Sequence, residues 1–568
     1  MRFSATLSRL SLLALLFTSI STVAPAKANP SSPDAPDAST AKMEAAREAA
    51  KGDALLEALL AELNRSKEHL KMDQLQAPYY IEYRVNDVDT FDAEAAFGAL
   101  RESDRSHLRF LRVVVRIGDY KQDSYYGQGM GSGSIIPIDD DPIAIRRQIW
   151  LLTDEAYKNA ADAYAEKLSA LKQYTADQEP VEDFAHAPVV TDVGQTVSLK
   201  IDSSVWDRTL QDATELYRQY PSIHSVEASA RFTAVNEYFV NSEGTVVRQG
   251  RTTATVTLSS LTQAPDGMRL GRSPFWTEAR PEDLPNHDEL LKQSKIMLDT
   301  LQALCQAPIV EESYRGPVLF APDAANDIIA GLVGDNVLGH RPPLGRPNRT
   351  TGAFATSYKS RVLPKFATVI DDPTMKTFDG KNLLGSYTVD SEGVNAQPVT
   401  LVNDGILVNY LTNREPLRDF PASNGHGRAT PGSSPLPSLG VLMLKSSDPE
   451  TPRELDDKLR QMAAEEGQPY GYRVDTLGPG NSPRLLYRVY VKDGREELVR
   501  GAVFNELDVR ALRNDLAAVG NDPLVSNRMA GLPQTIICPS LLFDELEVKR
   551  ADTTKEKLPE YPAPDLKQ

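Results

Sequence analysis

Apolar and polar residues alternate along several stretches of the first half of the chain, the pattern of strands with one buried face. Residues 79–88 read YYIEYRVNDV, and this period of two predicts a strand. Residues 93–101 and 108–117 extend the predicted sheet, although the first stretch is rich in alanine, a poor strand former. The segment 223–263 continues the alternation on both sides of the turn sequence Asn-Ser-Glu-Gly at 241–244. It therefore predicts a hairpin.

Other stretches place apolar residues three and four positions apart, which indicates helices with one buried face. From Lys42 onward, leucines recur at this spacing with Glu and Lys between them, and segments 141–174, 206–217 and 288–307 show the same period. Residues 125–133 are rich in glycine. They lack the lysine and the glycine spacing of a phosphate-binding loop, so we interpret them as a flexible surface loop.

The second half opens with residues 316–339, GPVLFAPDAANDIIAGLVGDNVLG. This block predicts a short strand, a turn at Pro322 and an amphipathic helix capped by Asp323. Residues 370–415 carry Asp-Pro and Asp-Gly turn signals between alternating apolar residues, and predict turn-linked strands. Further predicted elements are a strand at 441–445, a helix at 452–466, two strands within 485–506 joined by an Asp-Gly turn, a helix at 508–516 and a terminal strand within 532–550.

The two ends of the chain differ in composition from the rest. Arg2 and Arg9 precede and flank an apolar run at 10–17, and Ala-Lys-Ala at 26–28 is a small-residue cleavage pattern. This predicts a signal peptide over residues 1–28, with cleavage before Asn29. The apolar run is too short for a membrane span, so none is expected after cleavage. Residues 29–41 are predicted to be a disordered linker, and the charged, proline-rich residues 551–568 a disordered tail.

Composition narrows the classes of partner. The formal net charge is −17, and removal of the signal peptide with its Arg2, Arg9 and Lys27 makes it more negative. An acidic surface repels phosphate backbones, so no nucleic-acid partner is expected. Cys305 and Cys538 could pair in an oxidising compartment, but each lies in an apolar context, and we interpret both as buried and free.

Three blocks of the second half carry a family resemblance: 316–329, 371–415 and 424–428. They resemble the motifs of the TldD/PmbA family, whose members are often called modulators of DNA gyrase. The 241–244 turn and the PSLLF.E.E ending at 539–547 are also similar to this family. The resemblance implies an α+β fold of two domains, each mainly antiparallel sheet with packed helices, at 42–312 and 313–550.

The same resemblance identifies the positions of a lost metal motif. In the metalloprotease branch of the family, the helix of the first block carries His-Glu-x-x-x-His. In this chain those positions correspond to Ala330, Gly331 and Asp335. Alanine and glycine offer a metal no lone pair and supply no general base. The chain therefore resembles the metal-less, PmbA/TldE-like branch: no catalytic residue, metal ligand or cofactor is predicted, and zinc or iron is expected only where a homologous partner supplies the site.

Asn424, His426 and Arg428 lie in the glycine-flanked sequence SNGHGR, predicted to be an exposed loop. By resemblance to the family, this loop lines an interior cleft. His426 either contacts substrate there or is a plain loop histidine. Active family members also take a metal ligand from a late cysteine, but the context of Cys538 does not match that segment.

Four carboxylates lie in the second block: Asp371, Asp372, Asp390 and Glu392. They could form an acid/base pair or a site for a hard metal ion. Their positions beside Pro373 and Gly393 favour turn formation instead.

Three functions remain open at this stage. The first is an exported, non-catalytic subunit of a metalloprotease assembly, which binds peptide or unfolded protein and pairs with an intact TldD-like homologue or with copies of itself. The second is a divergent metallopeptidase that uses other ligands. The third is a stand-alone binding protein of the cell envelope. The signal peptide predicts a periplasmic or secreted location for all three.

Overall fold

The computed structural model describes residues 48–73, 75–173, 181–344, 349–552, 557–559, 561 and 564. The predicted signal peptide (1–28) and linker (29–41) lie outside these residues, as does part of the predicted tail (551–568). Within the described residues, no helix combines the length and the apolar character that a membrane crossing requires.

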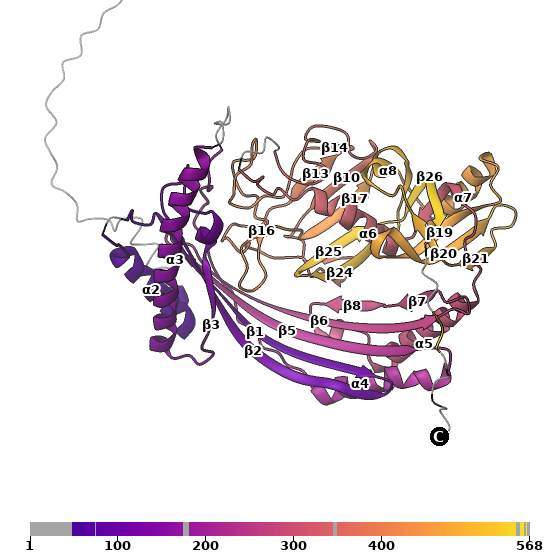
Figure 1. Ribbon diagram of the computed structural model, residues 1–568, viewed down its shortest axis with the longest axis horizontal. Coiled ribbons are helices and arrows are strands. Elements are labelled where there is room, and N and C mark those ends of the chain that lie inside the picture. The colour runs from indigo at the N-terminus through magenta and orange to yellow at the C-terminus, as the bar shows by residue number, and fades with distance from the viewer. Residues whose placement is uncertain are drawn as a thin grey trace, which may run out of the picture.

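A long, curved antiparallel sheet forms one side of the molecule (Figure 1). Its central strands, in spatial order, are β2 (Ala99–Arg116), β1 (Tyr80–Ala96), β5 (Ser225–Asn241) and β6 (Val246–Gln263). The predicted hairpin over 223–263 is confirmed as β5 and β6. Residues 93–101 do not form a strand of their own. They are the end of β1, the turn and the start of β2.

The turn between β1 and β2 explains that difference. Phe97 and Gly98 both have positive φ, 52° and 76°, as a two-residue hairpin turn requires. Four short strands complete the sheet: β3 (Ser132–Ile136) pairs with β2, whereas β4 (Thr191–Val193), β7 (Arg269–Arg272) and β8 (Phe275–Glu278) pair with β6. The glycine-rich segment 125–133 is therefore not a loop throughout, because its last two residues begin β3.

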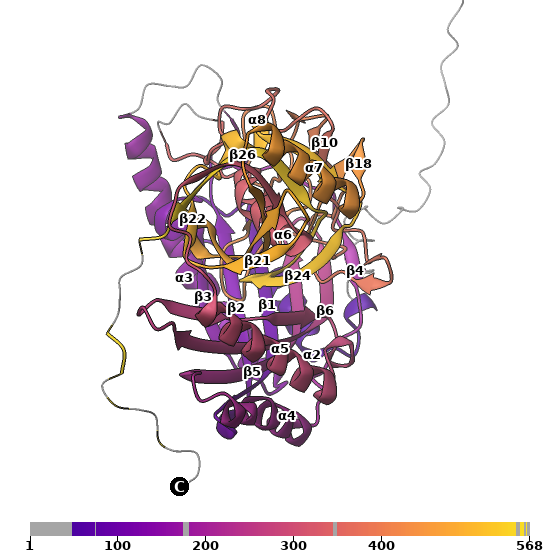
Figure 2. The same ribbon diagram turned by 90° about the vertical axis from the view of Figure 1, so that its right-hand side faces the viewer.

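Four helices cover the convex face of this sheet (Figures 1 and 2). They are α2 (Ala54–His69), α3 (Pro142–Leu171), α4 (Ser203–Glu215) and α5 (His287–Gln306). Alternate residues of the long strands pack against them in two apolar cores, one beneath α2 and α3 and one beneath α4 and α5. Ile81, Tyr83 and Val85 of β1 belong to the first core and Phe91 to the second. The apolar faces predicted for the strands and helices of the first half thus pack against each other on the convex side of the sheet.

The second half contains two further sheets and lies over the concave face of the first (Figure 2). One sheet has the order β14-β13-β10-β17-β25-β24, and the other has the order β18-β23-β26-β9-β19-β20-β21, with β22 also paired to β26. The strands of the first sheet are β10 (Ala367–Asp371), β13 (Val399–Asn403), β14 (Ile406–Leu407), β17 (Val441–Ser446), β24 (Leu524–Ala530) and β25 (Leu532–Cys538). The strands of the second are β9 (Tyr314–Phe320), β18 (Pro449–Glu450), β19 (Tyr470–Gly478), β20 (Ser482–Tyr490), β21 (Glu496–Val499), β22 (Ala502–Phe504), β23 (Leu516–Gly520) and β26 (Leu541–Arg550). Two separate hairpins, β11 (Thr377–Phe378) with β12 (Lys381–Asn382) and β15 (Gly427–Arg428) with β16 (Leu436–Pro437), complete the strands of this half.

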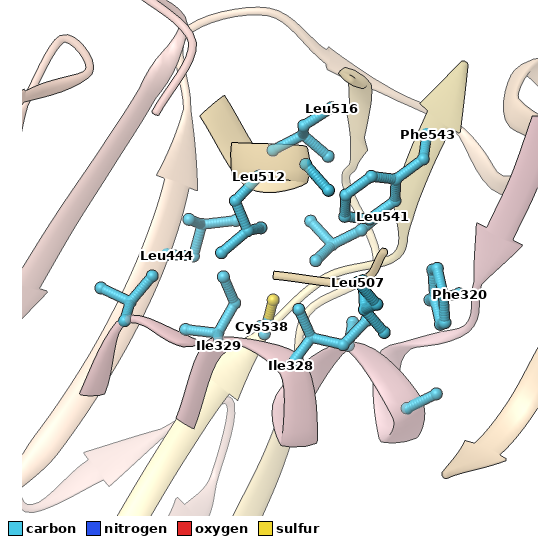
Figure 3. Packing of buried hydrophobic residues seen from close by; sticks show 14 of the residues in the cluster. Phe320, Ile328, Ile329, Leu444, Leu507, Leu512, Leu516, Cys538, Leu541 and Phe543 are labelled. Atoms are coloured by element: carbon cyan, nitrogen blue, oxygen red, sulfur yellow. The ribbon is translucent and has the colours of Figure 1, made fainter. Parts of the chain in front are cut away.

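Helix α6 (Pro322–Leu332) packs between these two sheets in the largest apolar core of the protein's described residues (Figure 3). Helix α7 (Pro452–Glu465) covers the other face of the second sheet, and α8 (Val509–Asn514) precedes β23. Asp323 does not cap α6 as predicted: the N-cap is Ala321, which makes no side-chain cap bond, and Asp323 lies in the first turn. An acid in that turn still interacts favourably with the helix dipole.

The segment 532–550, predicted as one terminal strand, is two strands in different sheets. β25 pairs with β17 and β24, whereas β26 pairs with β9 and β23. Pro539 and Ser540 connect them, and a proline has no N–H to continue a sheet ladder. The predicted boundary at residues 312 and 313 falls between α5 and β9 and stays a prediction. The α+β class, with mainly antiparallel sheets and packed helices, is confirmed.

Candidate functional site

The positions that the family resemblance aligns with the metal motif lie at the end of α6 and just beyond it. Ile328 and Ile329 point into the core of the second half (Figure 3), and Ala330 is half-buried against the same core. Gly331 is exposed, and a Cβ placed on it would have no neighbouring atom within 4 Å. Of the first two motif positions, Gly331 is therefore the one that faces open space.

Asp335, the third motif position, lies beyond the helix. It belongs to the 3-10 turn Gly334–Asn336, because α6 ends at Leu332. The three positions thus carry a methyl group, a hydrogen atom and a carboxylate that lies outside the helix. These groups cannot replace the two imidazole ligands and the general base of the metalloprotease motif. Within the described residues, no group of three or more His, Cys, Asp or Glu side chains is placed to hold a metal ion.

The prediction of an exposed loop is wrong for His426, whose side chain is fully buried, and for Arg428, which is also buried. Nδ1 of His426 lies 3.0 Å from the Asn424 carbonyl oxygen, and its Nε2 lies 3.3 Å from Oδ1 of Asp371. Asn424 itself joins two loops: its Oδ1 accepts from Thr412 N, and its Nδ2 donates to the carbonyl of Tyr410. Both side chains hold this loop in place. The flanking glycines predicted exposure, but the loop packs against β10 through the contact between His426 and Asp371.

The carboxylates of the second block accept backbone hydrogen bonds. Asp372 and Asp390 do so within turns, as predicted, whereas Asp371 and Glu392 bond to residues distant in the sequence. Oδ1 of Asp390 accepts from the backbone N–H groups of Glu392 and Val394, and its Oδ2 accepts from Gly427. Asp371 accepts from two successive backbone N–H groups, those of residues 440 and 441. These bonds fix the loop that carries Arg428 against β10 and β17.

Two of these acids are buried close together, which changes their ionisation. Burial raises the pKa of Asp390 to about 6, although its three backbone N–H donors act in the opposite direction. Burial and the neighbouring Asp390 charge raise the pKa of Glu392 well above its usual value. The pair therefore titrates above the range of exposed carboxylates.

Cys305 and Cys538 are both free and buried, as predicted. Cys305 belongs to the core beneath α4 and α5, and Cys538 to the core around α6 (Figure 3). Burial raises the pKa of the Cys538 thiol well above its usual value. Neither residue presents a reactive thiolate.

A cavity of about 620 Å³ lies between the long sheet and the second half. The long sheet contributes residues of β4 and β6 and the two residues that follow β4, 194 and 195. The second half contributes the loops around residues 373–376 and 384–396. Arg428 also lines it, which makes it the one member of the Asn424, His426 and Arg428 set placed in this cavity. The main polar lining residues are Asp192, Glu237, Arg248, Gln249, Arg251, Lys376, Ser386, Thr388, Asp390, Ser391 and Arg428.

A second cavity, of about 640 Å³, adjoins the first at Arg251, which lines both. Its floor consists of residues of β1, β2, β5 and β6, and its roof is the β24–β25 hairpin with Met529, Gly531 and Pro533. The floor combines small hydroxyl and methyl side chains with charged ones. The small residues include Ser229, Ala230, Thr233, Thr253, Thr255 and Thr257, and the charged residues are Asp92, Glu94, Glu102, Arg231 and Arg251. The two cavities together form one cleft between the halves, which we call the interdomain cleft.

Comparisons of the sequence and of the structure with known proteins both find relatives of this chain. Residues 313–550 match the family model described as PmbA/TldA metallopeptidase C-terminal domain. This match identifies residues 313–550 as similar to the C-terminal domain of the TldD/PmbA family.

Two curated relatives of this family carry metalloprotease names. A metalloprotease of Methanocaldococcus jannaschii is 23% identical over 310 residues, which are 54% of this chain and 63% of the relative. A metalloprotease TldD homologue of Buchnera aphidicola subsp. Schizaphis graminum is 26% identical over 202 residues, 35% of this chain and 41% of the relative. The chain thus spans less than two thirds of the length of either relative.

The fold also matches a solved structure from this family. The crystal structure of TldE from Thermococcus kodakarensis superposes with a TM-score of 0.57 at 14% identity, and the match covers 87% of this chain and 100% of TldE. At this identity the likeness establishes the fold alone.

Most residues of the interdomain cleft were not singled out by sequence reasoning. Arg251 and the threonines of β6 read as one face of an ordinary strand, and no motif marks them. One signal was available: the sequence RTTATVTLSS at 251–260 places polar residues at alternate positions opposite an apolar face. Such a face is solvent-exposed or covered by another domain, and only the tertiary structure shows which.

Proposed function

We propose that this protein is an exported, non-catalytic subunit of a metalloprotease assembly, and that it binds extended peptide segments in the interdomain cleft. The observation that carries the proposal is the cleft itself: two adjoining cavities of about 620 and 640 Å³ between the halves of a chain whose second half is similar to the TldD/PmbA family. Each volume lies in the range of sites that bind small ligands.

The lining of the cleft suits an extended backbone. Threonine and serine side chains on the floor offer hydroxyl groups that both donate and accept hydrogen bonds. β24 is a terminal strand, which among the described strands pairs with β25 alone, and Met529 near its end lines the second cavity. A terminal strand beside a cavity is the arrangement that binds peptides by strand addition.

The residues at the end of α6 and in the turn that follows it support the non-catalytic part of the proposal. The family relatives are named metalloproteases, but Ala330, Gly331 and Asp335 of this chain do not fit a metal ion. The proposal therefore assigns peptide binding to this chain and cleavage to a partner, an intact TldD-like homologue. Assembly of identical copies is the other form of partnership.

The first experiment separates binding from cleavage. Purified protein starting at Asn29 is mixed with a short, unstructured, fluorescein-labelled peptide, and anisotropy reports binding while mass spectrometry reports the integrity of the peptide. Binding without cleavage is expected from the protein alone, and cleavage after addition of a homologue with an intact His-Glu-x-x-x-His motif. Cleavage by the protein alone would mean a divergent peptidase, and absence of binding would leave a stand-alone envelope protein with another ligand.

Two threonines make a matched pair of variants for this experiment. Thr253 lines the second cavity, whereas Thr300 lies on α5 on the convex side. Thr253→Trp fills part of the cleft and should weaken peptide binding at least tenfold. Thr300→Trp adds the same side chain outside the cleft and should leave the affinity unchanged. Equal affinities of the two variants would place the peptide elsewhere.

Export is tested independently. The full-length precursor is expressed in a Gram-negative host, and intact mass is measured for the protein recovered from the periplasm and medium. Loss of residues 1–28 is expected, because Arg2, Arg9 and the apolar run at 10–17 precede the Ala-Lys-Ala pattern. Soluble cytoplasmic protein that retains Met1 would contradict an exported location.

A further inference from the structure

Arg428 is a buried cation without an acidic partner. The residue is 8% exposed, and within the described residues no ion pair joins it to a carboxylate. Nη1 donates to the carbonyl oxygens of Leu439 at 2.5 Å and Pro533 at 2.7 Å. The guanidinium also lies over the ring of Tyr387, 4.8 Å from its centroid. Two carbonyls and a ring hold the group in one orientation, but none of them neutralises its charge.

A second guanidinium approaches from the other half of the protein. Arg251 lies on β6 and lines the same cavity, and its one ion pair is a 3.5 Å contact with Glu237. Burial lowers the pKa of Arg428, and the positive charge of Arg251 acts in the same direction. Tyr387 and the carboxylates of Asp371 and Glu237 oppose this shift, but the pKa remains lowered. Two guanidinium groups from different halves thus face one cavity, which Lys376 also lines, and an anion between them would stabilise this arrangement.

The acids that line this cavity are already engaged. Asp390 accepts three backbone N–H groups. Asp192 accepts from the hydroxyl of Thr388, and Glu237 lies beside Arg251 and Asn86. The remaining lining cation of the sheet, Arg248, is paired with Asp53, which lies outside the cavity. The lining acids therefore leave Arg428 available to an incoming anion.

We propose that Arg428 and Arg251 together bind a carboxylate of an extended peptide at this end of the interdomain cleft. The inference rests on the peptide-binding function proposed above and names the group that is recognised. A planar guanidinium matches a carboxylate with two parallel hydrogen bonds. The Nη1 atom of Arg428 is used by carbonyls, so its Nε and Nη2 atoms form the edge that remains for the ligand.

The carboxylate can come from the carboxyl terminus of the peptide or from an acidic side chain. Three versions of one short, unstructured, fluorescein-labelled peptide distinguish these sources: one with a free carboxyl terminus and no acidic side chain, one with an amidated terminus, and one amidated with a single internal Glu. Binding of the free-carboxyl peptide at least tenfold tighter than the amidated peptide identifies the terminus. If the internal Glu restores the affinity of the amidated peptide, the recognised carboxylate is an acidic side chain.

Variants link the preference to the two arginines. Arg251→Gln removes one charge from a half-exposed position, and Arg428→Lys keeps the charge but loses the planar fork; both should reduce the preference for a carboxylate to less than threefold. Arg105→Gln is the matched control, because Arg105 also belongs to the long sheet and to an ion pair, with Asp89, but contacts the convex side at Leu199. It should retain the full preference. Far-ultraviolet circular dichroism and melting temperature verify the fold of each variant. If Arg428→Lys does not fold, the result for Arg251→Gln tests the carboxylate site.

The outcomes distinguish this inference from the function on which it rests. If all three peptides bind the wild-type protein with equal affinity, the carboxylate site is overturned while peptide binding stands. If none of them binds, both are overturned. A preference that persists undiminished in Arg251→Gln would also overturn the role of the paired arginines.

Discussion

The two faces of the long sheet are buried by different means. On the convex face, Phe91 of β1 and Phe232 of β5 pack with α4 and α5 in an apolar core. On the concave face, the alternate residues Glu82, Arg84 and Asn86 of β1 are buried as well, at 5%, 1% and 2% exposure. Their partners are polar groups: Arg84, for example, donates to the carbonyl oxygen of Ser391 in the second half.

This difference separates two roles of burial. Burial of apolar area on the convex face stabilises the sheet, but it does not by itself fix the exact position of the helices that cover it. Buried polar groups stabilise little in net terms, but each must find its partner, so they specify how the second half sits on the sheet. Near residues 80–86 this contact is closed, whereas farther along the strands the same face borders the cavities of the interdomain cleft. A polar interface can leave such space because its cavities hold water or ligand.

The largest effect is expected at Arg414, which closes the polar contact. It is fully buried and forms a two-bond ion pair with Glu243 at 2.8 Å, and it also donates to the carbonyl of Ala185. Arg414→Met leaves these acceptors without a donor and should lower the free energy of unfolding by about 4 kcal/mol. Urea denaturation measures it. Arg315→Met, which removes two exposed ion pairs, with Glu506 and Glu545, is the control and should cost less than about 1 kcal/mol.

A somewhat smaller effect is expected on the convex face. Leu210 of α4 is fully buried in the core beneath α4 and α5. Leu210→Ala should lower the free energy of unfolding by about 3 kcal/mol through lost apolar burial and the cavity that remains. Because no charge is involved, the loss should be the same in low and high salt. A salt-dependent loss would contradict the apolar description of this face, and Leu210→Met should cost less than about 1.5 kcal/mol.

The buried pair Asp390 and Glu392 should give the polar interface a pH dependence. An acid whose pKa is raised by folding keeps its proton in the folded state where the unfolded chain has lost it, so stability falls as pH rises above the unfolded value. The pKa of Asp390 is raised to about 6 and that of Glu392 well above its usual value. Glu392→Gln should therefore be more stable than the wild type at pH 7, by about 1 kcal/mol or more, and this advantage should shrink toward pH 4. Denaturation curves at several pH values measure the difference. An advantage that is independent of pH would show that Glu392 does not titrate in this range.

The smallest effect is expected in the open part of the concave face. Thr253 is half-buried and lines the second cavity. Thr253→Val should change the free energy of unfolding by about 0.5 kcal/mol or less, because no packed neighbour is lost. The same denaturation assay tests it. A loss comparable to that of Leu210→Ala would mean that the cleft is a packed interface rather than a binding surface.

Much of the fold follows from local patterns. The hairpin at 223–263, the helices at 141–174 and 288–307 and the strand before α6 were predicted because their period of two or 3.6 is set by one buried face. Residues 93–101 and 532–550 were misread because a tight turn and a Pro-Ser connection are short signals within apolar runs. In both cases the backbone direction changed while the hydrophobic pattern continued.

The candidate site was predictable only in part, for the same reason. Family motifs led to Arg428 and to the end of α6, but the burial of His426 and the position of Arg251 depend on contacts between distant segments.

The sequence by itself determined most of the strands and helices, the family relationship of the second half, and the presence of alanine and glycine at positions 330 and 331. Each of these depends on side-chain identity and near-neighbour spacing. The tertiary structure alone decided which polar strand faces are buried, which loop histidine is enclosed, and where two arginines from different halves meet around one cavity. Those outcomes depend on how the second half lies across the long sheet, and residues far apart in the chain share no local pattern that records such a contact.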